Sequence, residues 1–291
     1  MEIQAFAKLN LTLDILGKRE DGYHDLRMVM QSITLADTLT LEENQGEGLR
    51  VSANLRFLPT GEKNLAAAAA LRFWEALGRE PENLDIRIEK RIPVCAGMAG
   101  GSSDAAAVLR ALNQRAGDPF SPKELARLGE RVGSDVPYCV LGGTALAEGR
   151  GEVLTPLPPL PRCWVVACKP DFPISTPELF AQADRVKLRR RPDTAGLVAA
   201  LEAGDLGGVA RRMYNVFEDV LPARLYTRVA EIKNGLIQCG ALGTNMSGTG
   251  PTAFGLFEDR EKAQAAVEQL RESGGEWFLA ETMQSFPEIA E

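Results

Sequence analysis

The fold of this chain is decided by the stretch Lys90-Arg91-Ile92-Pro93-Val94-Cys95-Ala96-Gly97-Met98-Ala99-Gly100-Gly101-Ser102-Ser103-Asp104. Before it, apolar and polar residues alternate over residues 84–89, which is typical of a half-buried strand. After it, Ala105, Leu109 and Leu112 share one face of a helix. The stretch therefore predicts a loop that leads from a strand into a helix.

The composition of this loop predicts an anion site. Gly97, Gly100 and Gly101 can adopt positive φ and leave room for a close ligand. Residues 102–104 are all of N-cap type, so the helix is expected to begin beside them. A glycine-rich loop at a helix N-terminus presents unpaired N–H groups to phosphate, although the Walker pattern G-x-x-x-x-G-K-[ST] is absent from this chain. A tight turn with an ordinary N-cap is the alternative.

The composition of the whole chain excludes several classes of protein. Of its 291 residues, 45% are hydrophobic and 25% charged, as in a globular protein with a sizeable core. The net charge is −7 and only residues 187–191 are densely basic, which argues against a nucleic-acid partner. No apolar run approaches the roughly 18 residues of a membrane span, and residues 1–4 do not open a signal peptide.

The cysteines indicate the compartment. Their number is odd, and no pair has C-x-x-C spacing: Cys95, Cys139, Cys163, Cys168 and Cys239. We therefore expect five buried, small apolar side chains in a reducing cytoplasm, without disulfides or a zinc site.

The pattern of elements predicts an α+β protein. Residues 3–15 form a strand, and its polar face, which carries Lys8, Asn10, Thr12 and Asp14, is expected to meet water or a ligand. Residues 17–24 form a polar loop. The other expected strands are 28–33, 38–41, a pair within 138–147, 164–167, 241–246, 252–257 and 277–282, and the expected helices are 64–77, 122–132, much of 194–238, and 258–273. A proline-rich connection at 156–161 is a plausible domain boundary.

Three residues could carry chemistry, but each also has an ordinary interpretation. His24 is the only histidine and would normally be a solvated loop residue, although Tyr23 beside it offers an aromatic face. Asp135, between Ser134 and Val136-Pro137, is either a turn residue or a general base. Lys8 is either a surface lysine or part of a site. Composition and spacing leave these alternatives open.

A second small-residue loop, Ser247-Gly248-Thr249-Gly250, runs into Ala253 and so matches the dinucleotide pattern G-x-G-x-x-A. That pattern normally opens a helix, whereas residues 252–257 are expected to be extended. We interpret the loop as a second backbone clamp for phosphate or substrate.

Together, these stretches resemble those of the GHMP kinases (galactokinase, homoserine kinase, mevalonate kinase and relatives). Pro93-x3-Gly97-Met98-Ala99-Gly100-Gly101-Ser102-Ser103-Asp104-Ala105-Ala106 is similar to the phosphate-binding motif of that family. Three further stretches, at 7–24, 133–137 and 246–250, match in order and spacing members that act on 4-diphosphocytidyl-2-C-methyl-D-erythritol. The resemblance covers essentially the whole chain.

The resemblance implies a fold and an activity. It implies an N-terminal GHMP kinase domain (1–155) like the second domain of ribosomal protein S5, and a ferredoxin-like C-terminal GHMP kinase domain (156–291). It also implies transfer of the γ-phosphate of ATP, with Mg²⁺, to the 2-hydroxyl of that cytidine diphosphate-linked methylerythritol, in non-mevalonate isoprenoid precursor synthesis. The expected protein is a cytoplasmic monomer or weak homodimer without a membrane partner.

The resemblance also assigns residues. Asp135 becomes the catalytic base, with Lys8 as its oppositely charged partner. The nucleotide side comprises Asn64, Lys90, Pro93, Val94, Cys95, Ala96, Gly97, Met98, Ala99, Gly100, Gly101, Ser102 and Ser103. The substrate side comprises Asn10, Tyr23, His24, Thr176, Phe180, Gly248 and Thr249, with Tyr23 and Phe180 expected to sandwich the cytosine ring.

Two departures from the family pattern and two rival functions are open at this stage. Ala99 stands where the family has a glycine, and Pro251 removes an N–H after the second loop. One rival is a GHMP kinase for another alcohol, such as homoserine or mevalonate, which would not need the Tyr23-His24 pair. The other is a non-catalytic nucleotide-binding regulator, which would not need both Lys8 and Asp135.

Overall fold

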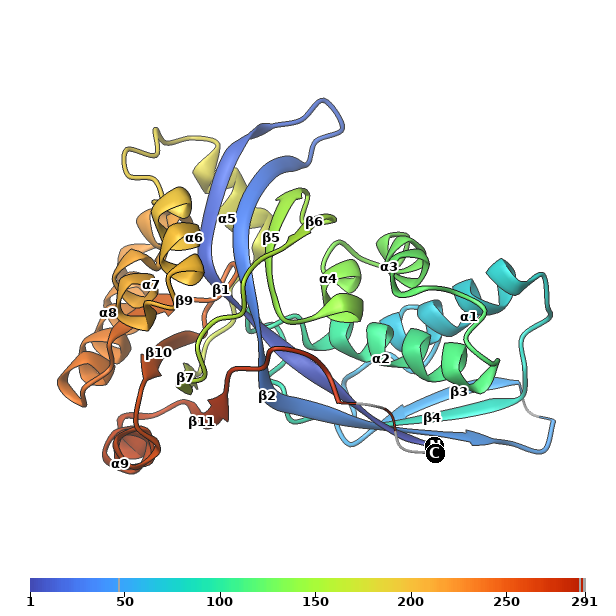
Figure 1. Cartoon of the computed structure of the whole chain (residues 1–291). Helices are drawn as coiled ribbons and strands as arrows, with labels where there is room; N and C mark the ends of the chain where they lie inside the picture. Colours follow the sequence, from blue (N-terminus) through green and yellow to red (C-terminus); the bar gives the residue numbers. More distant parts are fainter. Residues whose placement is uncertain (47, 288, 290–291) are drawn as a thin grey trace.

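The computed structural model describes residues 1–46, 48–287 and 289. Its first sheet has seven strands within that part of the chain, in the order β3-β4-β2-β1-β8, with β5 on β2 and β6 on β5. β1 and β2 form a long antiparallel hairpin that runs through the molecule (Figure 1). The strands are β1 (Glu2–Lys18), β2 (His24–Glu43), β3 (Leu49–Ala53), β4 (Leu84–Glu89), β5 (Thr144–Gly149), β6 (Val153–Pro156) and β8 (Tyr214–Asn215).

Four helices lie together on one side of this sheet (Figure 1). They are α1 (Leu65–Leu77), α2 (Gly100–Arg115), α3 (Pro122–Glu130) and α4 (Val136–Leu141). Alanines let α1 and α2 approach closely: residues 66–70 of α1 and 105–107 of α2 turn mostly buried alanines toward the core. Phe73 and Trp74 fill the remaining space and are almost completely buried.

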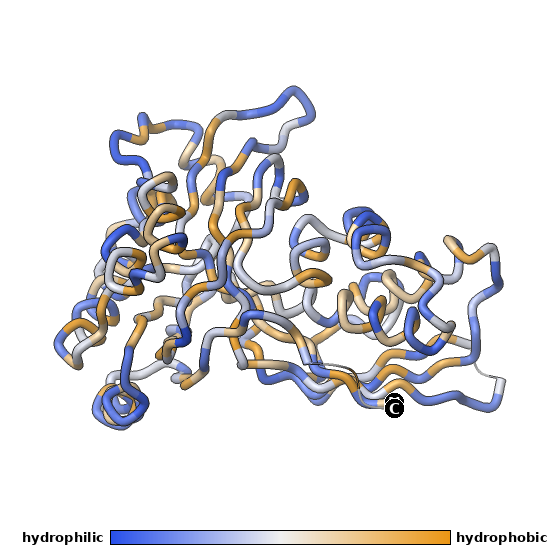
Figure 2. The backbone as a smooth tube through the Cα atoms, viewed as in Figure 1, coloured by the Kyte–Doolittle hydropathy of each residue, from blue (hydrophilic) through white to orange (hydrophobic). Residues whose placement is uncertain are grey.

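The second sheet is antiparallel, in the order β11-β7-β10-β9. Its strands are β7 (Trp164–Lys169), β9 (Gly243–Met246), β10 (Ala253–Phe257) and β11 (Glu276–Glu281). The helical segments of this half are α5 (Thr176–Ala183), α6 (Thr194–Glu202), α7 (Leu206–Arg212), η1 (Val216–Val220), α8 (Ala223–Gln238), α9 (Arg260–Leu270) and η2 (Arg271–Ser273). Apolar residues follow the central strands of both sheets, whereas the tip of the β1–β2 hairpin is hydrophilic (Figure 2).

The two halves are tied together at several points. β8 comes from the second half of the chain and pairs in parallel with β1 of the first sheet. After β11 the chain returns to the first sheet, where the N–H of Met283 donates to the carbonyl of Ser32 over 2.9 Å. Further on, Phe286 stacks on Phe6 with ring centroids 5.3 Å apart. These contacts hold the two halves of the chain against each other.

Most of the expected elements are confirmed, and two expectations were wrong. Residues 28–33 and 38–41 belong to one strand, β2, because β2 pairs with β1 along nearly its whole length. Residues 138–147 are not a strand pair: α4 occupies 136–141 and only β5 is a strand. Pro137 stands in the first turn of α4, and Gly142, at φ +69, ends the helix.

The proline-rich connection lies between the two sheets. β6 of the first sheet ends at Pro156 and β7 of the second begins at Trp164. The division into 1–155 and 156–291 stays a prediction. Among the helices that the structure describes, none has the length and apolar character to cross a membrane.

Candidate active site

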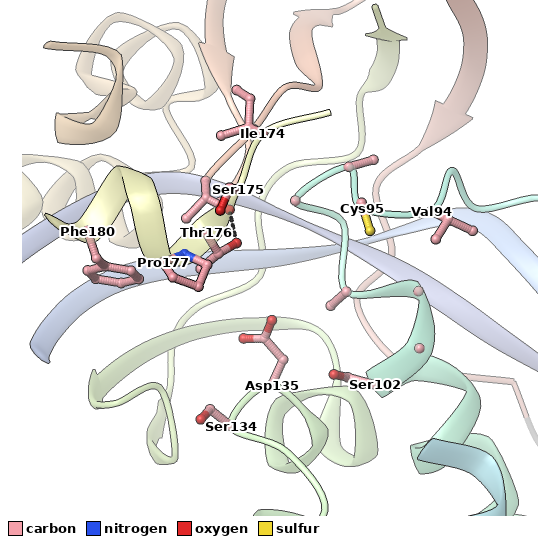
Figure 3. Close-up of a pocket in the computed structure, with 18 of the residues that line it drawn as sticks. Val94, Cys95, Ser102, Ser134, Asp135, Ile174, Ser175, Thr176, Pro177 and Phe180 are labelled. Atoms are coloured by element: carbon pink, nitrogen blue, oxygen red, sulfur yellow. Dashed lines mark hydrogen bonds between the residues drawn. The ribbon is translucent and has the colours of Figure 1, made fainter. Parts of the chain in front are cut away.

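A cavity of about 1070 Å³ opens between the two halves. Figure 3 shows Ser134, Asp135 and Ser102 on one side of it, facing Thr176 and Phe180 of α5 on the other. Val94 and Cys95, from the loop that precedes α2, close a third side. The cavity thus brings together segments that lie far apart in the sequence.

The loop before α2 has the backbone of an anion site. We had expected the N-cap of this helix among residues 102–104. α2 begins earlier, at Gly100, so these residues lie in its first turns. The N-cap is Ala99, at φ 59, which shows that an alanine occupies the left-handed conformation here. Ser103 is turned inward and donates from Oγ to the carbonyl of Phe6 over 2.7 Å. Gly100, Gly101 and Ser102 line the cavity, and their N–H groups precede the first hydrogen bond of the helix, from the N–H of Ser103 to the carbonyl of Ala99.

The second glycine loop is in contact with the first. The hydroxyl of Ser247 donates to the carbonyl of Gly97 over 2.8 Å, and a Cβ atom on Gly97 would overlap the carbonyl oxygen of Ser247. Gly97 has φ +74, so the contact requires glycine for both conformation and space. Asn10 supports the contact from below: it is fully buried, and its Oδ1 accepts from the N–H of Gly248 over 2.9 Å.

Lys8 and Asp135 form an ion pair at the floor of the cavity. Their Nζ and Oδ2 atoms are 3.8 Å apart, and the exposed fractions of the two side chains are 4% and 33%. Lys8 also donates to Oδ1 of Asn10 over 2.6 Å, which fixes its ammonium group. Asp135 is the N-cap residue of α4 but makes no capping hydrogen bond from its side chain. Its carboxylate is therefore available to a group in the cavity.

His24 is not a solvated loop residue, as its sequence context alone suggested. It is buried, and its Nε2 lies 2.6 Å from Oδ1 of Asp184. Its ring stacks on Phe180 at 4.6 Å. Hydrogen bonds from Lys18 and His24 lower the pKa of the Asp184 carboxyl. Phe180 lies in helix α5, and Asp184, four residues later, is the residue at which this helix ends. The last turn of α5 therefore provides both the stacking contact and the hydrogen bond to His24.

Tyr23 lies at the exposed rim of the same cavity. Its side chain is 56% exposed, and the guanidinium of Arg150 stands 5.3 Å from its ring centroid. Thr176 and Thr249 join the rim by a hydrogen bond of 2.8 Å between their hydroxyl groups, drawn as the dashed line in Figure 3. Polar and aromatic groups thus surround this end of the cavity.

Comparison with known proteins identifies the family. The model of the GHMP kinases N terminal domain matches residues 64–143, and that of the GHMP kinases C terminal matches residues 197–276. The chain belongs to the GHMP kinase family. The matched N-terminal segment contains the whole loop before α2 and Asp135, so two parts of the cavity wall belong to the segment that places the chain in the GHMP kinase family.

Individual relatives agree with this assignment. The chain is 44% identical to the 4-diphosphocytidyl-2-C-methyl-D-erythritol kinase of Alkaliphilus metalliredigens, over 93% of this chain and 92% of that one. It is 43% identical to the enzyme of the same name from Clostridium botulinum strain Eklund 17B, over 97% and 100% of the two chains. A crystal structure of 4-(cytidine 5'-diphospho)-2C-methyl-D-erythritol kinase superposes with a TM-score of 0.80 at 33% identity, over 97% and 99%. Homoserine kinase from Cytophaga hutchinsonii, at 21% identity and a TM-score of 0.72, shares the fold.

Most of the residues that the sequence placed in the site of this GHMP kinase line the cavity. They are Lys8, Tyr23, His24, Asn64, Lys90, Pro93, Val94, Cys95, Ala96, Gly97, Ala99, Gly100, Gly101, Ser102, Asp135, Thr176, Phe180, Gly248 and Thr249. Three do not line it, because they are buried beneath its wall: Asn10, Met98 and Ser103. Asn64 lines the cavity and also caps α1 by accepting from the N–H of Ala66.

Sequence reasoning missed two residues beside His24, and its expectation of burial was wrong for two cysteines. Asp184 follows Phe180 by four residues on a helix, a spacing that puts both on one face and could have indicated a shared partner. Lys18 reaches Asp184 from β1, which no local signal shows. All five cysteines were expected to be buried, but Cys95 is exposed in the cavity wall and Cys239 is only partly buried.

Proposed function

We propose that this GHMP kinase transfers the γ-phosphate of ATP to the 2-hydroxyl of 4-diphosphocytidyl-2-C-methyl-D-erythritol, a precursor of isoprenoids. The observation that carries the proposal is the single cavity in which a phosphate-type loop, an Asp–Lys pair and an aromatic pocket with a fixed histidine lie together. The names of relatives at 43–44% identity over more than nine-tenths of the chain support it.

The loop before α2 would bind the phosphates of ATP. Its glycines allow the backbone to approach the phosphate oxygens, and the N-terminus of α2 directs N–H groups and a positive dipole toward them. Lys90 and Asn64 also line the cavity, and the proposal places the adenosine beside them. Phosphoryl transfer needs positioning and charge stabilisation above all, and this loop supplies both.

Asp135 would act as general base on the acceptor hydroxyl. Its partly exposed carboxylate makes no capping bond, and Lys8 stands 3.8 Å away. The carboxylate would accept the proton of the 2-hydroxyl as the oxygen attacks the γ-phosphorus. The buried ammonium of Lys8, held by Asn10, keeps a positive charge beside the developing phosphate charge.

The rim formed by Tyr23, His24 and Phe180 would bind the cytosine ring. Aromatic side chains provide faces for stacking, and the fixed ring of His24 provides a polar edge. The pocket distinguishes this proposal from a kinase for homoserine or mevalonate, because those small alcohols have no base to stack. Retention of both Lys8 and Asp135 in ion-pair geometry argues against a non-catalytic regulator.

Mg²⁺ is part of the proposal as a companion of ATP. Among the residues that the structure describes, no group of three His, Cys, Asp or Glu side chains could hold a metal ion alone. This fits Mg²⁺, which usually keeps several waters and binds through substrate phosphates with few protein ligands. When bound, it would neutralise part of the phosphate charge.

A panel of acceptors tests the proposed function. With ATP and Mg²⁺, we expect kcat/KM for 4-diphosphocytidyl-2-C-methyl-D-erythritol to exceed that for homoserine and for mevalonate by orders of magnitude, measured as ADP release. A folded protein that turns over homoserine or mevalonate in preference to the cytidyl substrate would refute the substrate assignment.

Phe180→Ala tests the base pocket. We expect KM for the cytidyl substrate to rise about tenfold or more, since stacking of a base on an aromatic ring contributes about 1–3 kcal/mol, while KM for ATP stays near the wild-type value. Tyr226→Ala, which removes an exposed aromatic ring on α8, is the control and should change neither constant. Equal weakening of both substrates by Phe180→Ala would place Phe180 outside the cytosine site.

A further inference from the structure

Beneath the first turn of α2, one ammonium group lies between two buried carboxyl groups. Nζ of Lys90 is 2.5 Å from Oδ2 of Asp37 and 2.7 Å from Oδ2 of Asp104. The exposed fractions of these side chains are 4% for Lys90, 0% for Asp37 and 6% for Asp104. If all three were ionised, the cluster would bury one uncompensated negative charge, which is costly away from water.

The two carboxyl groups do not receive the same number of hydrogen bonds. Asp37 is fully provided with donors: its Oδ1 accepts from the N–H groups of Arg91 and Ile92, over 2.5 and 2.8 Å, and its Oδ2 from Lys90. Asp104 accepts from Lys90 alone, and its Oδ1 is buried without a partner. Hydrogen bonds therefore stabilise the ionised form of Asp37 more than that of Asp104.

Burial, together with the neighbouring charge of Asp37, raises the pKa of the Asp104 carboxyl to about 8, against the lowering effect of Lys90. Lys90 and Asp37 are the charged groups that act on it, from the end of β4 and from β2 respectively. A protonated Asp104 can donate a hydrogen bond to Asp37 while it accepts one from Lys90, which leaves the cluster neutral.

The cluster joins the two ends of the loop before α2. Asp37 holds the backbone that enters the loop, at Arg91 and Ile92. Asp104 belongs to the helix that leaves it, and the position of a Cβ atom on Gly100 would lie 3.2 Å from Nζ of Lys90. Lys90 and Asp104 also line the cavity. A change in the charge or geometry of this cluster therefore acts on the loop directly.

We propose that Asp104 is a positioning residue of the nucleotide site and serves as a neutral carboxylic acid, which bridges Asp37 and Lys90 and keeps the floor of the phosphate loop uncharged. The inference rests on the proposed function, because it assumes that the ligand of this loop is ATP. Loss of the proton places a buried negative charge beneath the N-terminus that binds a polyanion, so nucleotide affinity falls as the pH rises through about 8.

Binding of ATP in the absence of acceptor, measured by calorimetry from pH 6.5 to 9.5, tests this proposal. For the wild type we expect Kd to rise above pH 8, by up to about tenfold per pH unit, as loss of one proton requires. Asp104→Asn, whose amide donates and accepts like a neutral acid, should bind like the wild type at pH 7 and lack the alkaline rise. Asp104→Ala should bind at least several-fold more weakly at every pH. An alkaline rise that persists in Asp104→Asn, or an Asn variant as weak as the Ala variant at pH 7, would overturn the proposal.

Unfolding without nucleotide tests the protonation of Asp104 independently of ATP. In the unfolded chain the Asp104 carboxyl ionises near its ordinary pKa of 3.8, whereas in the folded protein its pKa is about 8. Between these two pKa values the folded wild type holds one proton more than the unfolded chain. Its free energy of unfolding should therefore fall, relative to that of Asp104→Asn, as the pH rises from about 4 to about 8, and the difference should stay constant above that. A stability difference between the two that does not vary over this range would refute a neutral Asp104. Failure of the protein to bind ATP at any pH would instead refute the proposed function.

Discussion

Asp135→Asn is expected to lower kcat by about 10²–10⁴-fold, the usual contribution of a positioned general base, while ATP binds as in the wild type. The amide keeps the shape of the carboxylate but cannot take the proton of the acceptor hydroxyl. The change should not unfold α4, because the Asp135 side chain makes no capping hydrogen bond. Steady-state kinetics should show kcat and kcat/KM falling together, the sign of an interaction made in the transition state.

A matched control separates chemistry from helix stability in this experiment. Asp205→Asn changes another helix N-cap aspartate, whose carboxylate accepts from the N–H of Gly208 at the start of α7, away from the cavity. It should leave kcat near the wild-type value. Turnover by Asp135→Asn at a rate close to the wild type would show that Asp135 is not the base, and Lys8 would then need another role.

Gly97→Ala should have the second large effect, on nucleotide binding and stability together. Gly97 has φ +74, where a Cβ atom is strained, and that atom would overlap the carbonyl oxygen of Ser247. The two glycine loops would have to separate, which breaks the hydrogen bond from Ser247 to Gly97. We expect a lower melting temperature and a large rise in KM for ATP, since the phosphate loop loses its support from the second half of the protein.

Gly78→Ala isolates the conformational part of that effect. Gly78 caps α1 at φ +65, and no atom lies within 4 Å of the position of its Cβ. This variant should lose only the about 1–2 kcal/mol of a left-handed non-glycine residue and should bind ATP normally. If Gly97→Ala were no more harmful than Gly78→Ala, the contact between the two loops would not matter for nucleotide binding.

Local pattern was sufficient to predict many of the elements that carry the site. The alternation over residues 84–89, the glycines of the loop and the apolar face of α2 predicted the strand, loop and helix that the structure contains. α3 begins at Pro122, as expected, and Ser121 and Glu124 form a capping box at this end. These features depend on neighbours within a few residues, which a sequence displays directly.

The failures have physical reasons. The run 136–141 is short and apolar, so periodicity does not separate a buried strand from a buried helix, and the structure contains α4. Asn10 was expected on a face open to ligand, but the second glycine loop covers that face and uses its side chain. Local sequence could not indicate the cluster of Asp37, Lys90 and Asp104, because the sheet brings together residues 53 positions apart.

Phosphorus NMR of the reaction product tests the central claim most directly. The protein is incubated with ATP, Mg²⁺ and 4-diphosphocytidyl-2-C-methyl-D-erythritol, and the products are followed with time. The account predicts one new phosphomonoester on the 2-hydroxyl for each ADP formed, with the diphosphate bridge intact. ADP accompanied only by inorganic phosphate, or a phosphomonoester at another hydroxyl, would contradict it.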